Sequence, residues 1–275
     1  GLGEVSHDIK DRERILDELA IASQLQRDIL PTESPQINGL YVCAKNRPAT
    51  ELGGDCFDFV SAKGKTYIYL GDVTGHGVAA GLIMTMVNSL IDVFANLYDS
   101  AYEILVNVNR YIKSHVKKAM FMTLVMLSWD EKRQSLSFVG AGHEHILVYR
   151  ADSGTCDVIL SGGIALGMVP DNSEVIREQE IPLGVGDYIV LYSDGIIEAR
   201  NASGEMFGIE RLTKLLQDFA PQYSAEGINY HIAKEVSAFV LGTEQQDDMT
   251  LIVIERKSAD TPISVTQDNT TNWNA

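Results

Sequence analysis

The stretch Thr66–Ala80 reads TYIYLGDVTGHGVAA and predicts a buried strand that ends on an aspartate. Aromatic and β-branched residues fill positions 66–70, which favours a strand, and Gly71-Asp72 closes it. The apolar run over residues 76–97 is typical of a helix. A carboxylate therefore stands between a buried strand and an apolar helix, where an unpaired charge is costly.

Short strands and paired helices are expected on both sides of this stretch. The expected strands are Leu40–Asn46, Cys56–Ser61, Thr66–Asp72, Phe121–Trp129, Ser135–Gly140, His145–Arg150, Cys156–Leu160, Val175–Ile181, Tyr188–Tyr192 and Met249–Glu255. The expected helices are 76–97, 100–118, 208–218 and 225–240. Strands and helices do not alternate strictly, which argues against a doubly wound parallel sheet. We expect an α/β (α+β) fold, an α-β-β-α sandwich of two mostly antiparallel sheets flanked by helix pairs.

Residues 35–257 are predicted to form this single domain, with segments of different character on either side. Residues 8–31 are predicted to form an N-terminal linker or regulatory helix, because apolar residues recur at helical spacing up to Pro31. Gln26 interrupts the apolar stripe. The helix either packs on its own domain or pairs with a second copy and carries a signal inward. The polar tail 258–275 is expected to be mobile.

The charge balance restricts the partners. The 275 residues include 38 acidic and 22 basic side chains, a formal charge of −16, and 45% of them are hydrophobic. The negative electrostatic field of such a chain disfavours nucleic acid and anionic membrane as partners and suits the binding of hard cations. Cys43, Cys56 and Cys156 lie far apart without a C-x-x-C motif, which argues against disulfides and zinc and favours a reducing cytosol. No apolar run of membrane-spanning length and no signal peptide are expected, so we predict a cytoplasmic location.

Aspartates at strand ends are the candidate functional residues. They occur in Gly53-Gly54-Asp55-Cys56-Phe57-Asp58, Gly71-Asp72-Val73-Thr74-Gly75, Ser193-Asp194-Gly195 and Gln246-Asp247-Asp248-Met249-Thr250. None of these motifs contains Lys or Arg, so a divalent cation is the natural partner of the carboxylates. Ligands that are all oxygen favour Mg²⁺ or Mn²⁺ over zinc. Each motif alone is also typical of a turn or a helix N-cap.

These motifs, in this order, resemble those of the metal-dependent protein phosphatases of the protein phosphatase 2C type. The resemblance is closest to the bacterial branch of the stage II sporulation E and sigma-B regulator phosphatases. Gly71–Ala80, Gly140-Ala141-Gly142-His143 and Phe207-Gly208-x-Glu210-Arg211-Leu212 fit that branch, as does a helix that ends at Leu30-Pro31. The resemblance covers about residues 13–257 and implies the same α-β-β-α sandwich.

The resemblance also implies a site and a reaction. Two Mn²⁺ or Mg²⁺ ions, with a third as an open alternative, would activate water for hydrolysis of phosphoserine or phosphothreonine without a covalent phosphoenzyme. Asp72 would bridge the ions and the Val73 carbonyl would bind one of them. Asp55 would bind on one side, and Asp194 and Asp247 on the other.

Further residues are given smaller or open roles. By the resemblance, Asp58 and Asp248 would be outer or conditional ligands. Arg47 is a candidate contact for the substrate phosphate, with a plain surface residue as the alternative. Thr74 stands where the animal enzymes have a histidine, and whether His76 donates a proton or shapes the turn stays open. Cys56 replaces an aromatic residue that is common in the branch, with a small expected effect on packing.

Other functions fit the sequence less well. Gly53–Phe57 is near the Gly-Gly-Asp-Glu-Phe signature of cyclic-dinucleotide cyclases, but Cys56 stands where that signature needs glutamate. No D-x-D-x-D-G calcium loop occurs. A catalytically silent phosphatase-like binding module is the main alternative to an enzyme.

The resemblance implies a phosphorylated STAS-domain protein, an anti-sigma-factor antagonist, as the substrate. A homodimer through the N-terminal helix is a hypothesis, as is an attached membrane sensor in a longer protein. Neither nucleic acid nor direct membrane contact is expected for this chain.

Overall fold

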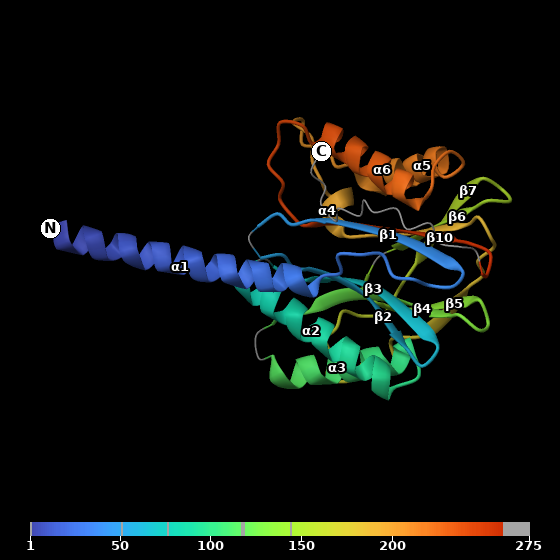
Figure 1. Cartoon of the computed structure of the whole chain (residues 1–275), viewed down its shortest axis with the longest axis horizontal. Helices are drawn as coiled ribbons and strands as arrows, with labels where there is room; N and C mark the ends of the chain where they lie inside the picture. The colour runs from blue at the N-terminus through green and yellow to red at the C-terminus, as the bar shows by residue number, and fades with distance from the viewer. Residues whose placement is uncertain (1, 51, 76, 117–118, 144, 261–275) are drawn as a thin grey trace.

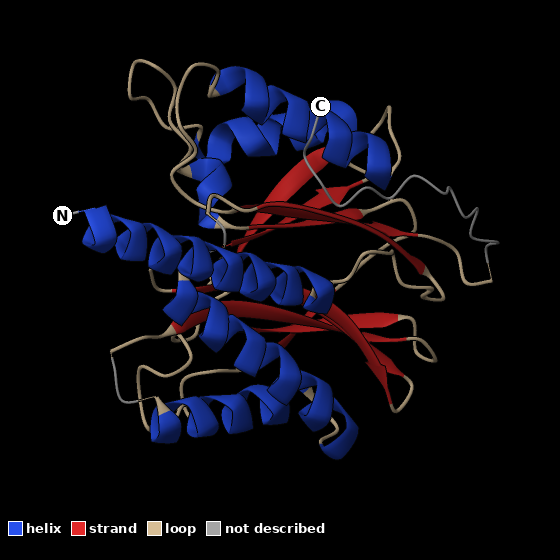
Figure 2. Ribbon diagram, turned by 60° about the vertical axis from the view of Figure 1, so that its left-hand side comes forward, coloured by secondary structure: helices blue, strands red, loops and turns tan. Residues whose placement is uncertain are grey.

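The computed structural model describes residues 2–260 apart from 51, 76, 117–118 and 144. Its centre is a pair of five-stranded sheets that lie face to face, with helices on both outer surfaces (Figures 1 and 2). Sheet A has the order β1 (Leu40–Arg47), β10 (Met249–Arg256), β9 (Tyr188–Tyr192), β6 (His145–Arg150) and β7 (Thr155–Leu160). Sheet B has the order β2 (Asp55–Ala62), β3 (Lys65–Val73), β4 (Met122–Asp130), β5 (Ser135–Ala141) and β8 (Glu178–Ile181).

All neighbouring strands in both sheets pair antiparallel. Because side chains alternate along a strand, the inner strands of the two sheets divide their apolar residues between two cores. On β3, Ile68 and Leu70 enter the core between the sheets, whereas Tyr67 and Tyr69 enter the core under the helices. Both faces of these strands are therefore buried.

Two helix pairs cover the sandwich. Helices α2 (Val78–Leu97) and α3 (Ala101–His115) pack on sheet B, and α5 (Gly208–Phe219) and α6 (Ala225–Phe239) pack on sheet A. The fold class predicted from the sequence is thus confirmed. By length and composition α2 could also span a membrane, which the sequence reading did not anticipate. One face of the helix, with Ala80, Met84, Val87 and Ile91, packs in the core on sheet B, as in the core helices of globular proteins that meet the same criteria, whereas Leu82 and Val93 are exposed.

Helix α1 (Leu2–Ile29) begins earlier than expected, ends just before Pro31, and extends beyond the sandwich (Figure 1). Among its side chains from residue 7 onward, the buried ones are Ser23 and Gln26 in the last turns, while Ile15, Leu16 and Leu25 are exposed. The helix therefore docks on its own domain at one end and exposes apolar side chains along the rest.

Two local predictions differ from the structure. Strand β8 begins at Glu178 rather than Val175, because residues 172–176 form a turn in which the amides of Val175 and Ile176 donate to the Asn172 carbonyl. The short helix α4 (Asp194–Ile197) was not expected. The predicted mobile tail lies outside the described residues from 261 onward.

Candidate active site

Asp55 and Asp72 face each other across neighbouring strands of sheet B. They are direct partners in the β2–β3 register. Both continue the rows of side chains that enter the core between the sheets, since Phe57 and Leu70 next along these rows belong to that core. The antiparallel pairing therefore places two carboxylates side by side at the mouth of the sandwich.

Sheet A supplies two further acids to the same end of the sandwich. Asp194 begins α4 directly after β9, and Asp247 lies in the loop before β10. Leu251 pairs with Tyr192 in the register, and the Ser193 amide donates to the Thr250 carbonyl at 3.0 Å. The end of β9 and the start of β10 are thus held together, and Asp194 and Asp247 with them.

The carboxylates act on one another electrostatically. Burial raises the pKa of Asp72 from 3.8 to about 7, and the charges of Asp247, Asp194 and Asp248 contribute to the rise. Burial, then the charges of Asp72 and Asp248, raise the pKa of Asp55 well above its usual value. Negative charge at this site is therefore unfavourable without a cation or a proton.

Asp55 has a partner for only one of its oxygens. The Thr250 hydroxyl donates to Asp55 Oδ2 at 2.6 Å and accepts from Asn46 Nδ2 at 2.7 Å, a chain of hydrogen bonds that crosses from sheet A to sheet B. Asp55 Oδ1 is buried and has no hydrogen-bond partner within the described part of the chain. An oxygen of this kind, beside a second carboxylate, fits a hard divalent cation.

No three His, Cys, Asp or Glu side chains among the described residues already stand at ligating distance around one point. The structure therefore does not define a closed metal centre. What fits a cation is the donor chemistry: oxygens only, one of them buried and unpaired, in a field that raises the carboxyl pKa values.

Asp248 supports the loop that carries Asp55. Its carboxylate accepts from the amides of Ala49 at 2.8 Å, Gly54 at 2.6 Å and Asp55 at 3.1 Å. Three backbone donors occupy both oxygens, so this side chain braces the turn before β2. A side chain on Gly53 would intrude here, since a Cβ would lie 2.7 Å from Asp248 Oδ2.

Asp58 lies on the other face of sheet B, away from the remaining acids. It follows Asp55 by three residues, and Cys56, which shares its face, belongs to the core under α2 and α3. Burial raises the pKa of Asp58, and the charge of Asp92 on α2 adds to the effect. The structure thus places Asp58, expected as an outer or conditional ligand, apart from the other candidate acids, because strand alternation turns it towards the helices.

Two further candidates, Val73 and Arg47, lie at the ends of strands β3 and β1. The Val73 carbonyl and Asp72 Oδ1 would lie 3.3 Å and 3.4 Å from a Cβ on Gly54, so this glycine permits the close approach of two candidate ligand atoms. Arg47 ends β1 as an exposed residue opposite Met249. His76 lies outside the described residues.

Gln26 of α1 reaches this site, which sequence reasoning did not foresee. Its side-chain amide donates to the Gly53 carbonyl at 3.0 Å and accepts from the Gly53 amide at 2.9 Å. The only signal in the sequence was the break that Gln26 makes in the apolar stripe. Sequence reasoning also missed the role of Thr250, although it lies in one of the four aspartate motifs.

Thr250→Val is expected to raise the Mn²⁺ concentration needed for half-maximal turnover by about 10-fold, because outer partners of metal ligands contribute about 10–100-fold to affinity. The substitution keeps the side-chain shape and removes the bond to Asp55. Activity measured against Mn²⁺ concentration checks this. Thr66→Val is the matched control, because Thr66 is a buried threonine near the start of β3, at the opposite end of that strand from Asp72. Equal metal dependence in the two variants would contradict the role of Thr250.

Comparison with known proteins places this geometry in a family. The family model described as "Stage II sporulation protein E (SpoIIE)" matches residues 62–257. The chain is 30% identical over 250 residues to the phosphoserine phosphatase RsbU of Bacillus subtilis, covering 90% of this chain and 72% of RsbU.

Solved structures agree on the fold. The SiaA-PP2C domain of Pseudomonas aeruginosa superposes with a TM-score of 0.74 at 23% identity, covering 89% of this chain and 98% of that one. A structure of the RsbU and RsbW domains of Rv1364c from Mycobacterium tuberculosis superposes with a TM-score of 0.68 at 26% identity, covering 84% of this chain and 64% of that one. From these matches and the sandwich fold, the chain belongs to the SpoIIE family of PP2C-type protein phosphatases.

Proposed function

We propose that this chain hydrolyses phosphoserine or phosphothreonine on a protein by means of two divalent cations, Mn²⁺ or Mg²⁺. The observation that carries the proposal is the buried, unpaired Asp55 Oδ1 beside Asp72, in a field that raises both carboxyl pKa values. Similarity to RsbU, which is named a phosphoserine phosphatase, supports the substrate class.

In this proposal Asp72 would hold both ions and the Val73 carbonyl would bind one of them. Asp55 would hold the ion on the sheet B side, and Asp194 and Asp247 would hold the ion on the sheet A side. The number of ions, two or three, is a matter for metal titration. When bound, such ions supply a water of lowered pKa and neutralise charge on the phosphoryl oxygens.

Other residues would act around these ligands. Asp248 fixes the loop before Asp55 through three backbone amides. Asp58 is left out of the ligand set because it lies on the helix side of β2. Arg47, exposed at the end of β1, would contact the phosphate.

Turnover of a small aryl phosphate and of a phosphoserine peptide, each with Mn²⁺ and with EDTA, tests the proposal. We expect Mn²⁺-dependent hydrolysis of both, abolished by EDTA. Asp194→Asn is expected to remove most of this activity because it weakens one side of the ligand set. Failure to hydrolyse either substrate with Mn²⁺ or Mg²⁺ would overturn the enzyme proposal in favour of a silent binding module.

We further propose that the substrate is a phosphorylated STAS-domain protein in a partner-switching system. The pairing of an RsbU domain with an RsbW domain in the chain of Rv1364c supports this partner class. Incubation with a phosphorylated STAS-domain protein and an unrelated phosphoprotein, followed by phosphate release, tests it. Equal rates on both proteins would remove the STAS assignment while leaving the phosphatase intact.

Helix α1 is proposed as a linker that couples an input to the site. Gln26 holds both backbone polar groups of Gly53, its amide and its carbonyl, two residues before Asp55. A Cβ on Gly81 of α2 would lie 2.7 Å from Gln26 Nε2, so the helix also sits tightly against α2. Movement of α1 would thus displace both the turn before Asp55 and α2.

Gln26→Ala is expected to lower kcat/KM severalfold and to destabilise the protein by about 1–3 kcal/mol. The reason is that the buried amide and carbonyl of Gly53 lose their hydrogen-bond partner. Gln24→Ala is the matched control, since Gln24 is exposed on the same helix and its side-chain bonds stay within that helix in the described structure. Thermal unfolding and peptide hydrolysis check the pair. The coupling idea fails if the two variants behave alike.

The exposed apolar side chains of α1 are proposed to pair with a second copy. Ile15 and Leu16 are 52% and 65% exposed, well before the docked turns. The double variant Ile15→Glu, Leu16→Glu is expected to convert a dimer into a monomer in size-exclusion chromatography with light scattering, whereas Arg12→Glu is expected to leave the mass unchanged. A monomeric wild-type protein would refute this dimer. A cytoplasmic location, with α1 joined to a sensor, completes the proposal.

A further inference from the structure

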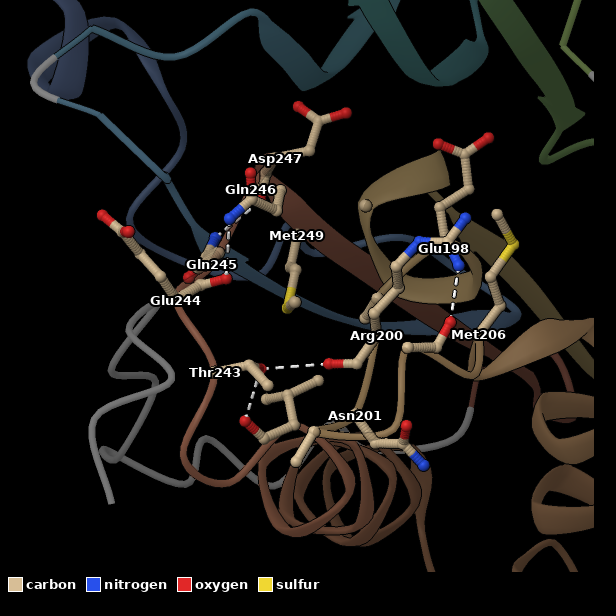
Figure 3. A pocket seen from close by; sticks show the side chains of 15 residues that line it. Glu198, Arg200, Asn201, Met206, Thr243, Glu244, Gln245, Gln246, Asp247 and Met249 are labelled. Atoms are coloured by element: carbon tan, nitrogen blue, oxygen red, sulfur yellow. Dashed lines mark hydrogen bonds between the residues drawn. The ribbon is translucent and has the colours of Figure 1, made fainter.

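A cavity of about 430 Å³ adjoins the candidate active site on the outer side of sheet A (Figure 3). It lies between a loop over residues 198–206 and a second loop over residues 240–247. It shares Gly195 and Asp247 with the site. The consecutive residues Met249 and Thr250 connect the two places, since Thr250 bonds Asp55 while Met249 lines the cavity.

The first loop is a compact hairpin. Arg200 and Met206 form a β-bridge, and the Asn201 amide donates to the Glu205 carbonyl at 3.0 Å. The Asn201 side-chain oxygen accepts from the amides of Ser203 at 3.0 Å and Glu205 at 2.9 Å. This wall of the cavity is therefore preformed.

The second loop is tied both to the first loop and to the site. The Thr243 hydroxyl lies within hydrogen-bond distance of the Val240 carbonyl at 2.6 Å and of the Arg200 carbonyl at 3.0 Å, and so bridges the two walls of the cavity (Figure 3). Gln245 Nε2 donates to the carbonyls of Arg47 at 2.8 Å and Asp247 at 2.7 Å. The cavity is consequently held in a fixed relation to Asp247.

The cavity lining combines apolar residues with polar and charged ones. Met249, Ala199 and Val240 line the interior, and in Figure 3 the Met249 side chain lies between the two loops. Met206 lines the cavity while 43% exposed. Methionine side chains adapt to varied apolar groups. Glu198, Glu244 and Asp247 also line the cavity and outnumber Arg200, so the charged part of the lining is acidic on balance and disfavours an acidic side chain of the ligand.

We propose that this cavity receives an apolar side chain of the substrate polypeptide that lies within a few residues of the phosphorylated serine or threonine. The inference rests on the proposed function, because it assumes that a phosphoryl group binds at Asp55, Asp72, Asp194 and Asp247. A polypeptide that enters there passes Asp247 and reaches the cavity. A volume of this size is typical of sites that recognise small groups.

The test uses the wild-type protein with Mn²⁺ and a series of phosphoserine peptides. Leucine, alanine, lysine or glutamate is placed in turn at each of the positions flanking the phosphoserine. At one position we expect leucine to exceed alanine, lysine and glutamate by about 10-fold in kcat/KM, the scale of discrimination that apolar pockets achieve. A small aryl phosphate, which carries no neighbouring amino-acid side chain, gives the reference rate.

Variants of the cavity lining test whether the leucine preference arises in the cavity. Ala202 is exposed and lines the cavity, so Ala202→Trp is expected to fill it and to remove the leucine preference. Ser203→Trp is the matched control, since Ser203 is exposed in the same hairpin outside the cavity lining. Met206→Ala is expected to enlarge the cavity and shift the preference from leucine towards phenylalanine.

The outcomes distinguish a failure of this inference from a failure of the proposed function. A flat peptide profile, a preference for a charged side chain, or a leucine preference that survives Ala202→Trp overturns the subsite while aryl phosphate turnover continues. Loss of all turnover in the wild type, aryl phosphate included, instead overturns the proposed function, and the subsite with it.

Discussion

Asp72→Asn is expected to lower metal-dependent turnover of a phosphoserine peptide by about 10³-fold or more, because several kcal/mol of transition-state stabilisation depend on the ions it would hold. The same substitution is expected to make the metal-free protein more stable. The two effects have one cause: Asp72 shares a buried site with Asp55 and lies in the field of Asp247 and Asp194.

The direction of the stability effect depends on pH. The pKa of Asp72 is raised from 3.8 to about 7 in the folded protein, so the folded state disfavours the charged carboxylate. The penalty is absent below the unfolded pKa and complete above about pH 7, and the metal-free wild type therefore loses stability as pH rises through this window. Asp72→Asn removes a cost on the order of 1–3 kcal/mol at pH 8 and almost none at pH 4.

Urea unfolding in EDTA at the two pH values, together with peptide hydrolysis in Mn²⁺, measures both effects. Asp58→Asn is the matched control for activity, since Asp58 is a half-buried carboxylate on the opposite face of the neighbouring strand β2. It is expected to retain near wild-type turnover. Comparable activity losses in the two variants would show that the face assignment is wrong.

Gly195→Ala is expected to prevent accumulation of folded, active protein. A Cβ at this position would lie 1.8 Å from the Asp248 carbonyl oxygen and 2.8 Å from its carbon, both backbone atoms. Neither α4 nor the start of β10 can yield without displacing Asp194 or Asp248. Forced contacts of this kind cost about 3 kcal/mol or more.

Gly64→Ala provides the contrast for this prediction. Gly64 has a φ of +76°, but a Cβ there would meet no atom within 4 Å, so alanine costs only the strain of a left-handed backbone, about 1–2 kcal/mol. Soluble yield, thermal unfolding and turnover compare the two variants. If Gly195→Ala were as stable and active as Gly64→Ala, the tight packing of α4 on β10 could not be essential.

Much of the fold follows from sequence pattern because the strands are short, strongly apolar and bounded by clear turns. Asp58 shows a point that the motif alone left open. A motif of two aspartates three residues apart suggests a joint role, yet an odd spacing on a strand places them on opposite faces. Strict use of the period of two would have separated Asp58 from Asp55.

Gln26 and α4 show what local sequence could not reveal. In the sequence Gln26 only interrupts an apolar stripe. Its contribution to the structure comes from two tertiary hydrogen bonds to Gly53, which is distant in sequence. Helix α4 spans only Asp194–Ile197, too short for any periodicity to register. In both cases packing between distant segments decides the outcome.

The four acids proposed as main ligands are divided equally between the two layers: Asp55 and Asp72 lie on strands of sheet B, and Asp194 and Asp247 lie in segments that adjoin strands of sheet A. A cation held by both pairs would therefore work as a cross-link between layers, closing a loop that contains most of the domain. Its affinity would add directly to the free energy of unfolding, since a chain with separated sheets has no such site. For this protein the supply of divalent metal would then set resistance to proteolysis as well as catalytic rate.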